Sequence, residues 1–443
     1  MSDNGSIAEL LPAPDERPLD AYYYPPQKYM IPRDGGGWVN VSLSGLKLAL
    51  KERGLLNMAG AGQLLSPIES FTHELHTRYA VDFAGGLAGY RYGWYQRNGH
   101  NILVTEELKL PEAVQGECPI IEKLFGRWFG EPQLPYVLGW LKHGYLNLLP
   151  DNQAFQPAQM LALCGEPGAG KNLFQDIVTE ILGGRVAKPY RYLSGGTTFN
   201  SDLTGAEHLQ ISDEVAKQDY PTRRRFGSAI KDICVNNQQS IHAKGREAIN
   251  LPLRWRLTAS LNDREEDLRV LPPYEKQLWE KITLIKFHHG KELLPAQHER
   301  ETFWSTILAE IPALCGFLMN YPIPKALTDP RYGVTRYHNP ELLIALDAIS
   351  PELQLHDLIV EKLFEDGITP EWNGTATELH TELGNKIGFD SLRDITPSAI
   401  CTGKYLTRLE EKKDQPHVQL DVTYTRKMNR RSYQIELKRD MTA

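Results

Sequence analysis

The stretch QMLALCGEPGAGKNLFQDIVTEILGG, residues 159–184, constrains the fold of this chain more than any other. An apolar strand, Met160–Cys164, runs straight into a loop with the pattern GxxxxGK, and a helix follows that stops at Gly183 and Gly184. Glycines let such a loop wrap a phosphate with its backbone N–H groups turned inward, and the helix N-terminus adds partial positive charge. A glycine-rich turn without a ligand is the alternative, and it explains neither flanking element. The pattern therefore predicts an α/β fold with a phosphate-binding loop.

The loop itself supplies the residues expected to hold a nucleoside triphosphate. They are Gly165, Glu166, Pro167, Gly168, Ala169, Gly170, Lys171 and Asn172. Lys171 brings a full positive charge to the β- and γ-phosphates. Asn172 stands where such loops usually carry a Ser or Thr, whose hydroxyl binds Mg²⁺. Because an amide oxygen can also ligate a hard cation, we expect Mg²⁺ binding to survive with Asn172 as a ligand.

Two later strands end in polar residues that suit the same site. The apolar strand that begins at His208 ends in Asp213 and Glu214, which would hold Mg²⁺ through water and activate the attacking water, respectively. A strand ending in two acids is common on its own, and it gains weight from the phosphate-binding loop before it. The next strand ends in Asn262, which could bind the γ-phosphate or the lytic water. A turn-forming Asn-Asp pair is the alternative for that residue.

A basic segment lies between these two strands. Residues 222–246 carry six Lys or Arg side chains and a single acid. Within it, SIHAKGREAINL reads as strand, turn and strand, with Lys244 and Gly245 at the tip. A basic hairpin tip suits contact with a phosphate backbone, whereas the alternative is a solvated surface hairpin.

The order of these motifs carries a resemblance to a known family. GEPGAGK, LQISDE, KDICVNNQQSIHAKG, LTASLND and LWEKITLIKF follow one another within about residues 120–345. The set resembles the superfamily 3 helicases, specifically the ATPase of phage- and plasmid-type primase-helicases related to the poxvirus enzyme. The resemblance implies an AAA+-like core that assembles as a ring, usually a hexamer. It also implies translocation on single-stranded DNA driven by ATP hydrolysis, with ATP and Mg²⁺ bound.

The resemblance also implies roles for single residues. Lys171 and Asn172 match Walker A, Asp213 and Glu214 match Walker B, and Asn262 matches sensor 1. Lys244 falls in the DNA-contacting hairpin, with His242 and Arg246 as its neighbours. The arginine that reaches the nucleotide of the neighbouring subunit is assigned to Arg269, with Arg264 as the second choice.

The last part of the chain predicts three helices followed by a basic hairpin. Ser350-Pro351 and Thr396-Pro397 are helix starts, and Thr375–Glu378 has the pattern of a capping box. This order resembles a winged helix domain, with its third helix in the major groove of duplex DNA and its hairpin on the backbone. The candidate DNA-binding residues there are Lys404, Arg426, Lys427, Arg430 and Arg431. Protein contact or packing within a ring is the alternative use of such a domain.

The domain plan that follows from these patterns has six parts. They are a disordered lead-in at 1–20, an α+β domain at 21–115, a helical segment packing on the ATPase at 116–154, the P-loop ATPase at 155–320, a linker at 321–345 and the winged helix domain at 346–443. No zinc ribbon and no clear acid pair precede the P-loop, so the chain resembles only the helicase half, and a primase or polymerase would be a separate partner.

Composition excludes several classes of protein. The chain has 49 basic and 56 acidic residues, a net charge of −7, which excludes a histone-like protein that binds nucleic acid by bulk charge but allows a local basic stripe. The five cysteines are scattered without a CxxC pair, so we expect no disulfide framework. No apolar run approaches the roughly 18 residues that span a bilayer, and the N-terminus is acidic. These features predict a cytoplasmic protein without a membrane partner.

Taken together, the sequence predicts an ATP-dependent, ring-forming DNA helicase of a phage or mobile-element replication system. It would act on single-stranded DNA and bind duplex DNA through its tail. Two alternatives stay open. The first is an ATP-hydrolysing, DNA-bound initiator or switch that does not unwind, and the second is a sequence-specific DNA-binding regulator with a degenerate ATPase.

Overall fold

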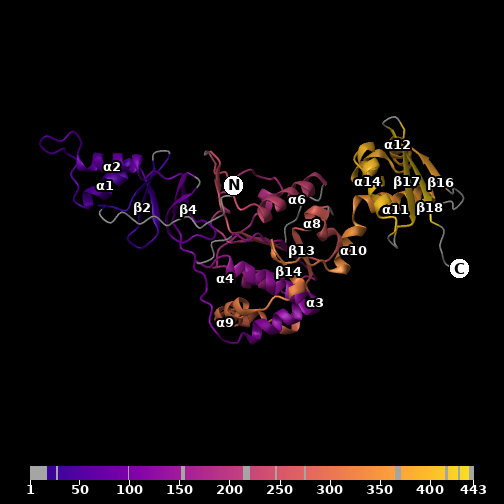
Figure 1. Ribbon diagram of the computed structural model, residues 1–443, viewed down its shortest axis with the longest axis horizontal. Coiled ribbons are helices and arrows are strands. Elements are labelled where there is room, and N and C mark those ends of the chain that lie inside the picture. The colour runs from indigo at the N-terminus through magenta and orange to yellow at the C-terminus, as the bar shows by residue number, and fades with distance from the viewer. Residues whose placement is uncertain are drawn as a thin grey trace. The chain divides into compact units, whose positions relative to one another are not determined.

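The computed structural model describes residues 17–25, 28–97, 99–150, 155–212, 220–244, 247–273, 276–364, 371–414, 418–427 and 430–438. The chain forms two compact units, one of residues 1–263 with 270–339 and the other of residues 264–269 with 340–443 (Figure 1). The short segment 264–269 thus belongs with the C-terminal part of the chain and not with the strand that precedes it.

A parallel sheet of five strands forms the centre of the first unit. Its order is β13-β7-β12-β9-β8. The strands are β7 (Met160–Cys164), β8 (Val186–Ala187), β9 (His208–Ser212), β12 (Arg256–Leu261) and β13 (Ile282–Lys286). All residues of β7 and β12 are buried, as expected for parallel strands that are covered on both faces. The α/β fold predicted from the apolar runs is therefore confirmed.

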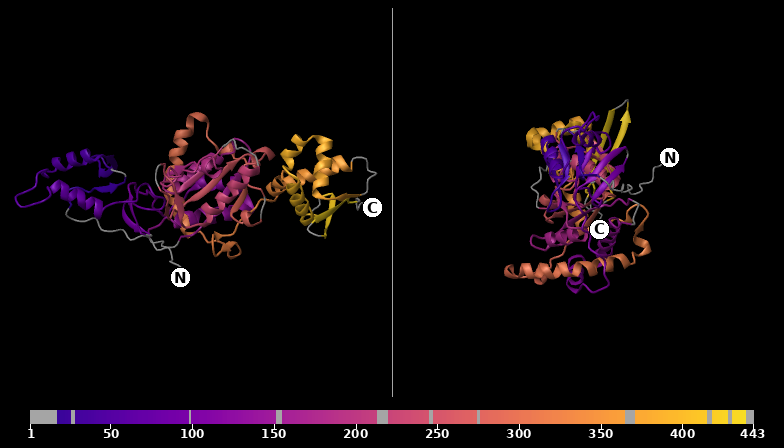
Figure 2. Two further views of the ribbon diagram at one scale, coloured as in Figure 1. Left: turned by 90° about the horizontal axis from the view of Figure 1, so that it is seen from above. Right: turned by 90° about the vertical axis from the view of Figure 1, so that its left-hand side faces the viewer.

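Three helices cover one face of this sheet. They are α3 (Pro119–Leu146), α4 (Lys171–Ile181) and α9 (Arg300–Asn320), and Figures 1 and 2 show α9 beside α3. Five aromatic side chains from α3, α4 and the end of β13 pack edge to face in this layer; they are Phe125, Trp128, Phe129, Phe174 and Phe287. The predicted helical segment around α3 is present, but the helix is broken at Gly130 and Glu131, whose backbone angles are non-helical.

Helix α9 corrects one expectation from the sequence. By length and composition alone, the segment Gln297–Asn320 could cross a membrane, although no uninterrupted apolar run suggested it. Charged and polar residues interrupt its apolar runs, but its average hydropathy stays as high as that of a membrane-spanning helix. The same criterion is also met by the core helices of soluble proteins. Ile307, Ile311, Leu314 and Leu318 of α9 are buried and belong to the core that includes α3 and α4.

The residues before α3 form two small sheets. The first is an antiparallel meander of β1 (Tyr22–Tyr24), β2 (Lys28–Pro32) and β3 (Trp38–Val41), accompanied by α1 (Leu43–Glu52) and α2 (Pro67–Thr77). The second has the order β4-β6-β5 and contains β4 (Phe83–Gly85), β5 (Gly93–Arg97) and β6 (His100–Val104).

The remaining elements of the first unit are short or connect the strands. They are α5 (Tyr190–Leu193), α6 (Tyr220–Val235), α8 (Lys276–Trp279), β14 (Thr328–Asp329) and β15 (Gly333–Val334), with 3₁₀ turns at Lys291–Leu293, Gln297–Glu299 and Lys325–Leu327. The predicted hairpin is also present as β10 (Gln239–Ile241) paired with β11 (Ile249–Leu251).

The second unit combines helices with a three-stranded antiparallel sheet of order β16-β18-β17. Its elements are α7 (Glu265–Leu268), α10 (Pro340–Ala348), α11 (Pro351–Leu363), β16 (Glu371–Gly374), α12 (Ala376–Ile387), α13 (Phe389–Ile395), α14 (Ala399–Glu411), β17 (Leu420–Lys427) and β18 (Arg430–Leu437). Ser350 caps α11, and Thr375 with Glu378 forms the predicted capping box of α12. The sequence interpretation missed β16 and α13, which are short and have no strong periodicity.

A buried ion pair joins the N-terminal residues to the central sheet. Glu207 is fully buried just before β9. Its carboxylate accepts a hydrogen bond from Arg185 Nε at 3.0 Å and one from the backbone N–H of Gly89 at 2.8 Å. Burial raises the pKa of Glu207, and the bond from Arg185 opposes that rise. The carboxylate therefore holds the loop after β4 against the edge of the sheet.

We expect Glu207→Ala to lower the free energy of unfolding by about 3 kcal/mol, because it leaves Arg185 and the Gly89 N–H without their acceptor. Urea unfolding followed by tryptophan fluorescence measures this change. The matched control is Glu292→Ala, which breaks the exposed pair with Arg127 at 2.6 Å and should leave the stability nearly unchanged. Equal effects of the two variants would contradict the structural role given to Glu207.

Candidate nucleotide-binding site

The phosphate-binding loop connects the end of β7 to the start of α4. Gly168 and Gly170 have φ angles of 75° and 105°, in the left-handed region that favours glycine. At Gly165 an added Cβ would lie 2.1 Å from the backbone oxygen of Phe287, so a side chain does not fit there. The backbone conformation and the available space therefore favour glycine at these three positions of the loop. The loop is followed directly by a helix N-terminus, as the motif requires.

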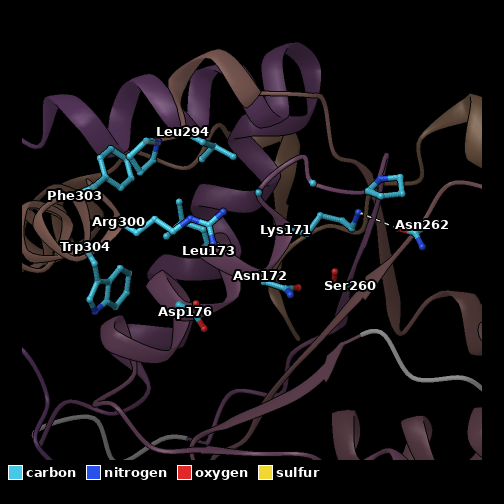
Figure 3. A pocket seen from close by; sticks show the side chains of 14 residues that line it. Lys171, Asn172, Leu173, Asp176, Ser260, Asn262, Leu294, Arg300, Phe303 and Trp304 are labelled. Atoms are coloured by element: carbon cyan, nitrogen blue, oxygen red, sulfur yellow. Dashed lines mark hydrogen bonds between the residues drawn. The ribbon is translucent and has the colours of Figure 1, made fainter. Parts of the chain in front are cut away.

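Lys171 points into the loop and links it to the neighbouring strand. Its side chain is buried, and Nζ donates hydrogen bonds to the backbone oxygens of Gly165 at 2.7 Å and Glu166 at 2.8 Å. The same atom lies 3.4 Å from Oδ1 of Asn262 (Figure 3). The structure thus brings together two of the predicted site residues that are far apart in sequence, and the role of Asn262 toward a ligand stays a prediction.

The sheet order explains why Asn262 reaches Lys171. Strand β12 lies between β7 and β9, with Ser260 paired to Leu163 on one side and to Ser212 on the other. Parallel strands end at the same edge of the sheet, so the residues that follow β12 meet the loop that follows β7. Asp213 and Glu214, the predicted Walker B pair, follow Ser212 in sequence and lie outside the described residues.

A cavity of about 540 Å³ opens beside the loop (Figure 3), a size typical of small-molecule sites. One end is polar and is lined by Gly168, Gly170, Lys171, Asn172, Ser260 and Asn262. The other end is lined mainly by apolar and aromatic side chains, namely Leu173, Leu294, Pro295, Phe303 and Trp304. Arg300 and Asp176 also face the cavity. One cavity thus combines a polar end next to the phosphate-binding loop with an apolar, aromatic end.

The residues of α9 in this cavity were missed by the sequence interpretation. ETFWST carries no phosphate-binding pattern, and it predicted only a helix after the core. Arg300, Phe303 and Trp304 reach the loop because α9 packs on α4, and that contact depends on tertiary structure. No local signal in the sequence could have placed them.

The polar end fits a triphosphate with Mg²⁺. The side chain of Asn172 is exposed to the cavity, and backbone N–H groups of the loop and of the first turn of α4 are available there. Ser260 is 1% exposed, and its hydroxyl oxygen has no hydrogen-bond partner within the described part of the chain. A buried hydroxyl that lines a cavity without a partner suits a site whose ligand carries oxygen or a hydrated cation.

A buried polar network lies behind the site and connects α4, β9 and β12. The His208 imidazole joins Thr179 of α4, with Nδ1 2.7 Å from Oγ1, to Thr258 of β12, with Nε2 2.8 Å from Oγ1. The Thr179 hydroxyl donates to the Gln175 carbonyl, and the Thr258 hydroxyl accepts from the Gln175 side chain. Thr179 is therefore free to accept from Nδ1–H, and Thr258 to donate to Nε2. This pattern fits a neutral imidazole.

Burial lowers the pKa of His208 to about 3. The unfolded chain takes up a proton at this residue below about pH 6.5, whereas the folded chain does not, so stability falls as the pH drops below 6.5. The free energy of unfolding falls for both proteins when the pH is lowered from 7 to 5, but in His208→Gln the fall should be smaller than in the wild type by about 2 kcal/mol. The difference arises because the variant lacks the imidazole, and one unit of pKa shift corresponds to about 1.36 kcal/mol. Urea unfolding at a series of pH values measures the difference.

His298→Gln provides the control for this pH series, because it makes the same substitution at an exposed residue outside the buried network. If His208→Gln and wild type lose stability in parallel as the pH falls, the neutral, buried state of His208 is wrong.

The predicted DNA hairpin is anchored through β10 and the residue that follows it. The Asn200 side chain accepts from the His242 backbone N–H at 2.8 Å and donates to the Ser240 oxygen at 2.9 Å. His242 packs its ring on Phe199, whereas Lys244 near the tip is exposed. The two strands match the prediction, and Gly245 and Arg246 lie outside the described residues.

The predicted arginine finger belongs to the second unit, where Arg264 and Arg269 flank α7. Arg264 is exposed and Arg269 is half-buried. The choice between the two arginines stays a prediction.

The second unit gathers several predicted DNA-binding residues around one hollow of about 1020 Å³. Lys404 of α14, Arg426 of β17 and Arg431 of β18 line it, together with the N-terminus of α12. Arg431 donates to the Thr407 hydroxyl at 2.9 Å and stacks on Tyr424. The side chains of Lys427 and Arg430 lie outside the described part.

Comparison with solved structures shows a shared fold. The C-terminal region of NrS-1, in an apo form, matches with a TM-score of 0.53 and 12% identity over 95% of this chain and 96% of that one, and a second apo structure of its residues 305–718 matches equally. By fold, the chain is similar to the C-terminal region of NrS-1 over nearly the full length of both chains.

Two further structures match more loosely, and their scores do not by themselves establish a shared fold. They are the JCV helicase (TM-score 0.26, 12% identity, 62% of this chain and 67% of that chain) and the active helicase Cch of SCCmec type IV (0.29, 12%, 92% and 75%). No protein-family model matches the chain, and no curated protein matches its sequence.

Proposed function

We propose that this protein is an ATP-dependent DNA helicase of the superfamily 3 type, which forms a ring and translocates on single-stranded DNA in phage or mobile-element replication. The observation that carries the proposal is the contact of Lys171 with both the phosphate-binding loop and Asn262 at the mouth of a nucleotide-sized cavity. The shared fold with the NrS-1 C-terminal region and the ordered motifs support the choice of a helicase among P-loop proteins.

In this proposal, the loop binds the triphosphate and Lys171 turns from the loop carbonyls to the β- and γ-phosphates. Mg²⁺, when bound, would neutralise charge on the phosphates, with Asn172 and Asp213 as the residues that hold it. Glu214 orients the attacking water, and Asn262 binds that water or the γ-phosphate. Arg269 of an adjacent subunit completes the site, which is why the proposal requires a ring.

The apolar end of the cavity is proposed to bind the adenine base. Phe303 and Trp304 project from the first turn of α9, and both are half-buried, so each keeps a face open to a ligand. A purine ring stacks well on an indole face. Arg300, one turn earlier on the same helix, would contact the ribose-phosphate part of the nucleotide.

We expect Trp304→Ala to weaken ATP binding about tenfold, since loss of one base–aromatic stack amounts to roughly 1–3 kcal/mol. Equilibrium titration with a fluorescent ATP analogue measures the affinity. Phe317→Ala is the matched control, because Phe317 lies on the same helix, is 37% exposed and does not line the cavity. An unchanged affinity in Trp304→Ala would place the base elsewhere.

The DNA contacts are proposed for two surfaces. The exposed Lys244 on the β10–β11 hairpin would grip the phosphates of single-stranded DNA inside the ring. In the second unit, which we propose to be a winged helix domain, Lys404, Arg426 and Arg431 would contact duplex DNA. Both surfaces place exposed cations on short, well-anchored elements.

Strand displacement on a forked duplex tests the function directly. Wild-type protein should unwind the fork with ATP and Mg²⁺ and show ATP turnover that single-stranded DNA stimulates. Lys244→Ala should lose most of the unwinding while keeping its unstimulated turnover, because the hairpin contacts DNA and not the nucleotide. Lys325→Ala, which removes an exposed lysine outside the hairpin, should behave as wild type.

Each outcome separates the alternatives. DNA-stimulated turnover without unwinding by the wild type would indicate the initiator or switch, and absence of turnover would indicate a regulator with a degenerate ATPase. Unchanged unwinding in Lys244→Ala would remove the hairpin from the mechanism.

A further inference from the structure

The face of β12 that packs against α4 carries the polar side chains of Thr258 and Ser260, and Asn262 continues this face just after the strand ends. Successive side chains of a strand alternate between its two faces, so Thr258, Ser260 and Asn262 share one face. The outer two have partners on α4, since Thr258 accepts from Gln175 at 2.8 Å and Asn262 lies 3.4 Å from Lys171. Ser260 stands between them and lines the cavity (Figure 3).

The hydroxyl of Ser260 is the exception on this face. The residue is 1% exposed, and its Oγ has no hydrogen-bond partner in the described part of the chain. A buried hydroxyl that gives up its hydrogen bonds to water destabilises the fold unless something replaces them. Because the neighbouring atoms are those of a phosphate-binding loop, a bound ligand is the group that would satisfy it.

The chemistry of the loop says which part of a ligand that would be. The position after Lys171 usually offers a hydroxyl to Mg²⁺, and here it offers the amide of Asn172. The first turn of α4 therefore lacks this hydroxyl, while β12 places an unpartnered one in the lining of the same cavity. Mg²⁺ binds oxygen ligands and usually keeps several waters, so it can be held from both sides.

We propose that the Ser260 hydroxyl supplies the contact to the hydrated Mg²⁺ of the bound nucleotide that the loop lacks, acting together with the amide oxygen of Asn172. Ser260 is thus a metal-positioning residue of the nucleotide site. The proposal rests on the nucleotide binding proposed above, and the experiment is chosen so that the two can fail separately.

The test measures binding of a fluorescent ATP analogue over a series of Mg²⁺ concentrations and in excess EDTA. In Ser260→Ala, the Mg²⁺ concentration that gives half of the maximal increase in analogue binding should rise about tenfold, because a hydrogen bond to a charged group amounts to roughly that factor. The affinity for the analogue in EDTA should be unchanged. Ser260→Thr, which keeps a hydroxyl, should stay within about threefold of wild type. Ser305→Ala removes a hydroxyl that donates to the Glu301 carbonyl outside the cavity and should change nothing.

The melting temperature of the nucleotide-free protein shows whether the hydroxyl has only a structural role. Removal of an unpartnered buried hydroxyl should leave the apo protein as stable as wild type or raise its Tm by roughly 2 °C. A lower Tm of apo Ser260→Ala would show that the hydroxyl has a structural partner and would overturn the proposal.

The binding data overturn the proposal in two further ways. A wild-type Mg²⁺ dependence in Ser260→Ala would show that the hydroxyl does not contact the hydrated cation. An equal loss of affinity with Mg²⁺ and with EDTA would show that it contacts the nucleotide itself. If wild-type protein binds no nucleotide under any condition, the proposed function fails instead.

Discussion

The proposed activity depends above all on one interaction, the contact of the Lys171 ammonium group with the backbone of the phosphate-binding loop. Lys171 begins α4, is 6% exposed and donates to the carbonyls of the loop that precedes it. A phosphate oxygen is a stronger hydrogen-bond acceptor for an ammonium group than a neutral carbonyl is. We propose that Lys171 exchanges these carbonyl contacts for phosphate oxygens when a nucleotide binds, and that the glycines of the loop leave room for the phosphates.

The sheet and its helices serve this placement. With β12 inserted between β7 and β9, these three parallel strands end at the same edge of the sheet, and Asn262, which follows β12, comes within reach of the loop. The His208 network behind the loop fixes α4 to both neighbouring strands, so the loop is held on a rigid base. Helix α9, which packs on α3 and α4, closes the other end of the cavity with the aromatic side chains of Phe303 and Trp304.

Much of the central fold could be predicted because its signals are local. The fully buried runs of β7 and β12, and the glycines around Lys171, predict strand, loop and helix without any tertiary information. Asn262 is different: a simple turn explains its local sequence as well, and only the motif order assigns it to the nucleotide site, while the pairing of its strand with β7 becomes visible in the structure. The predicted helical segment over α3 was right in type, yet a single glycine in the left-handed region, Gly130, divides it.

What could not be predicted depends on long-range packing. Arg300 and Trp304 join the site because α9 packs on α4, and no pattern in their own segment indicates a ligand. The unpartnered state of the Ser260 hydroxyl likewise becomes visible only when all of its neighbours are in place. In the second unit, the helix caps at Ser350 and Thr375 were readable from local chemistry, whereas the pairing of β16 with β18 depends on residues far apart in the chain.

The most direct test of this account is the affinity of purified protein for ATP in the presence of Mg²⁺, measured by isothermal titration calorimetry beside a Lys171→Ala variant whose folding is verified by circular dichroism. The account predicts saturable binding at one site per chain in the wild type and at least a tenfold weaker affinity in the variant, as expected for loss of a charged hydrogen bond to phosphate. Absence of binding by the wild type, or equal binding by both proteins, would contradict it.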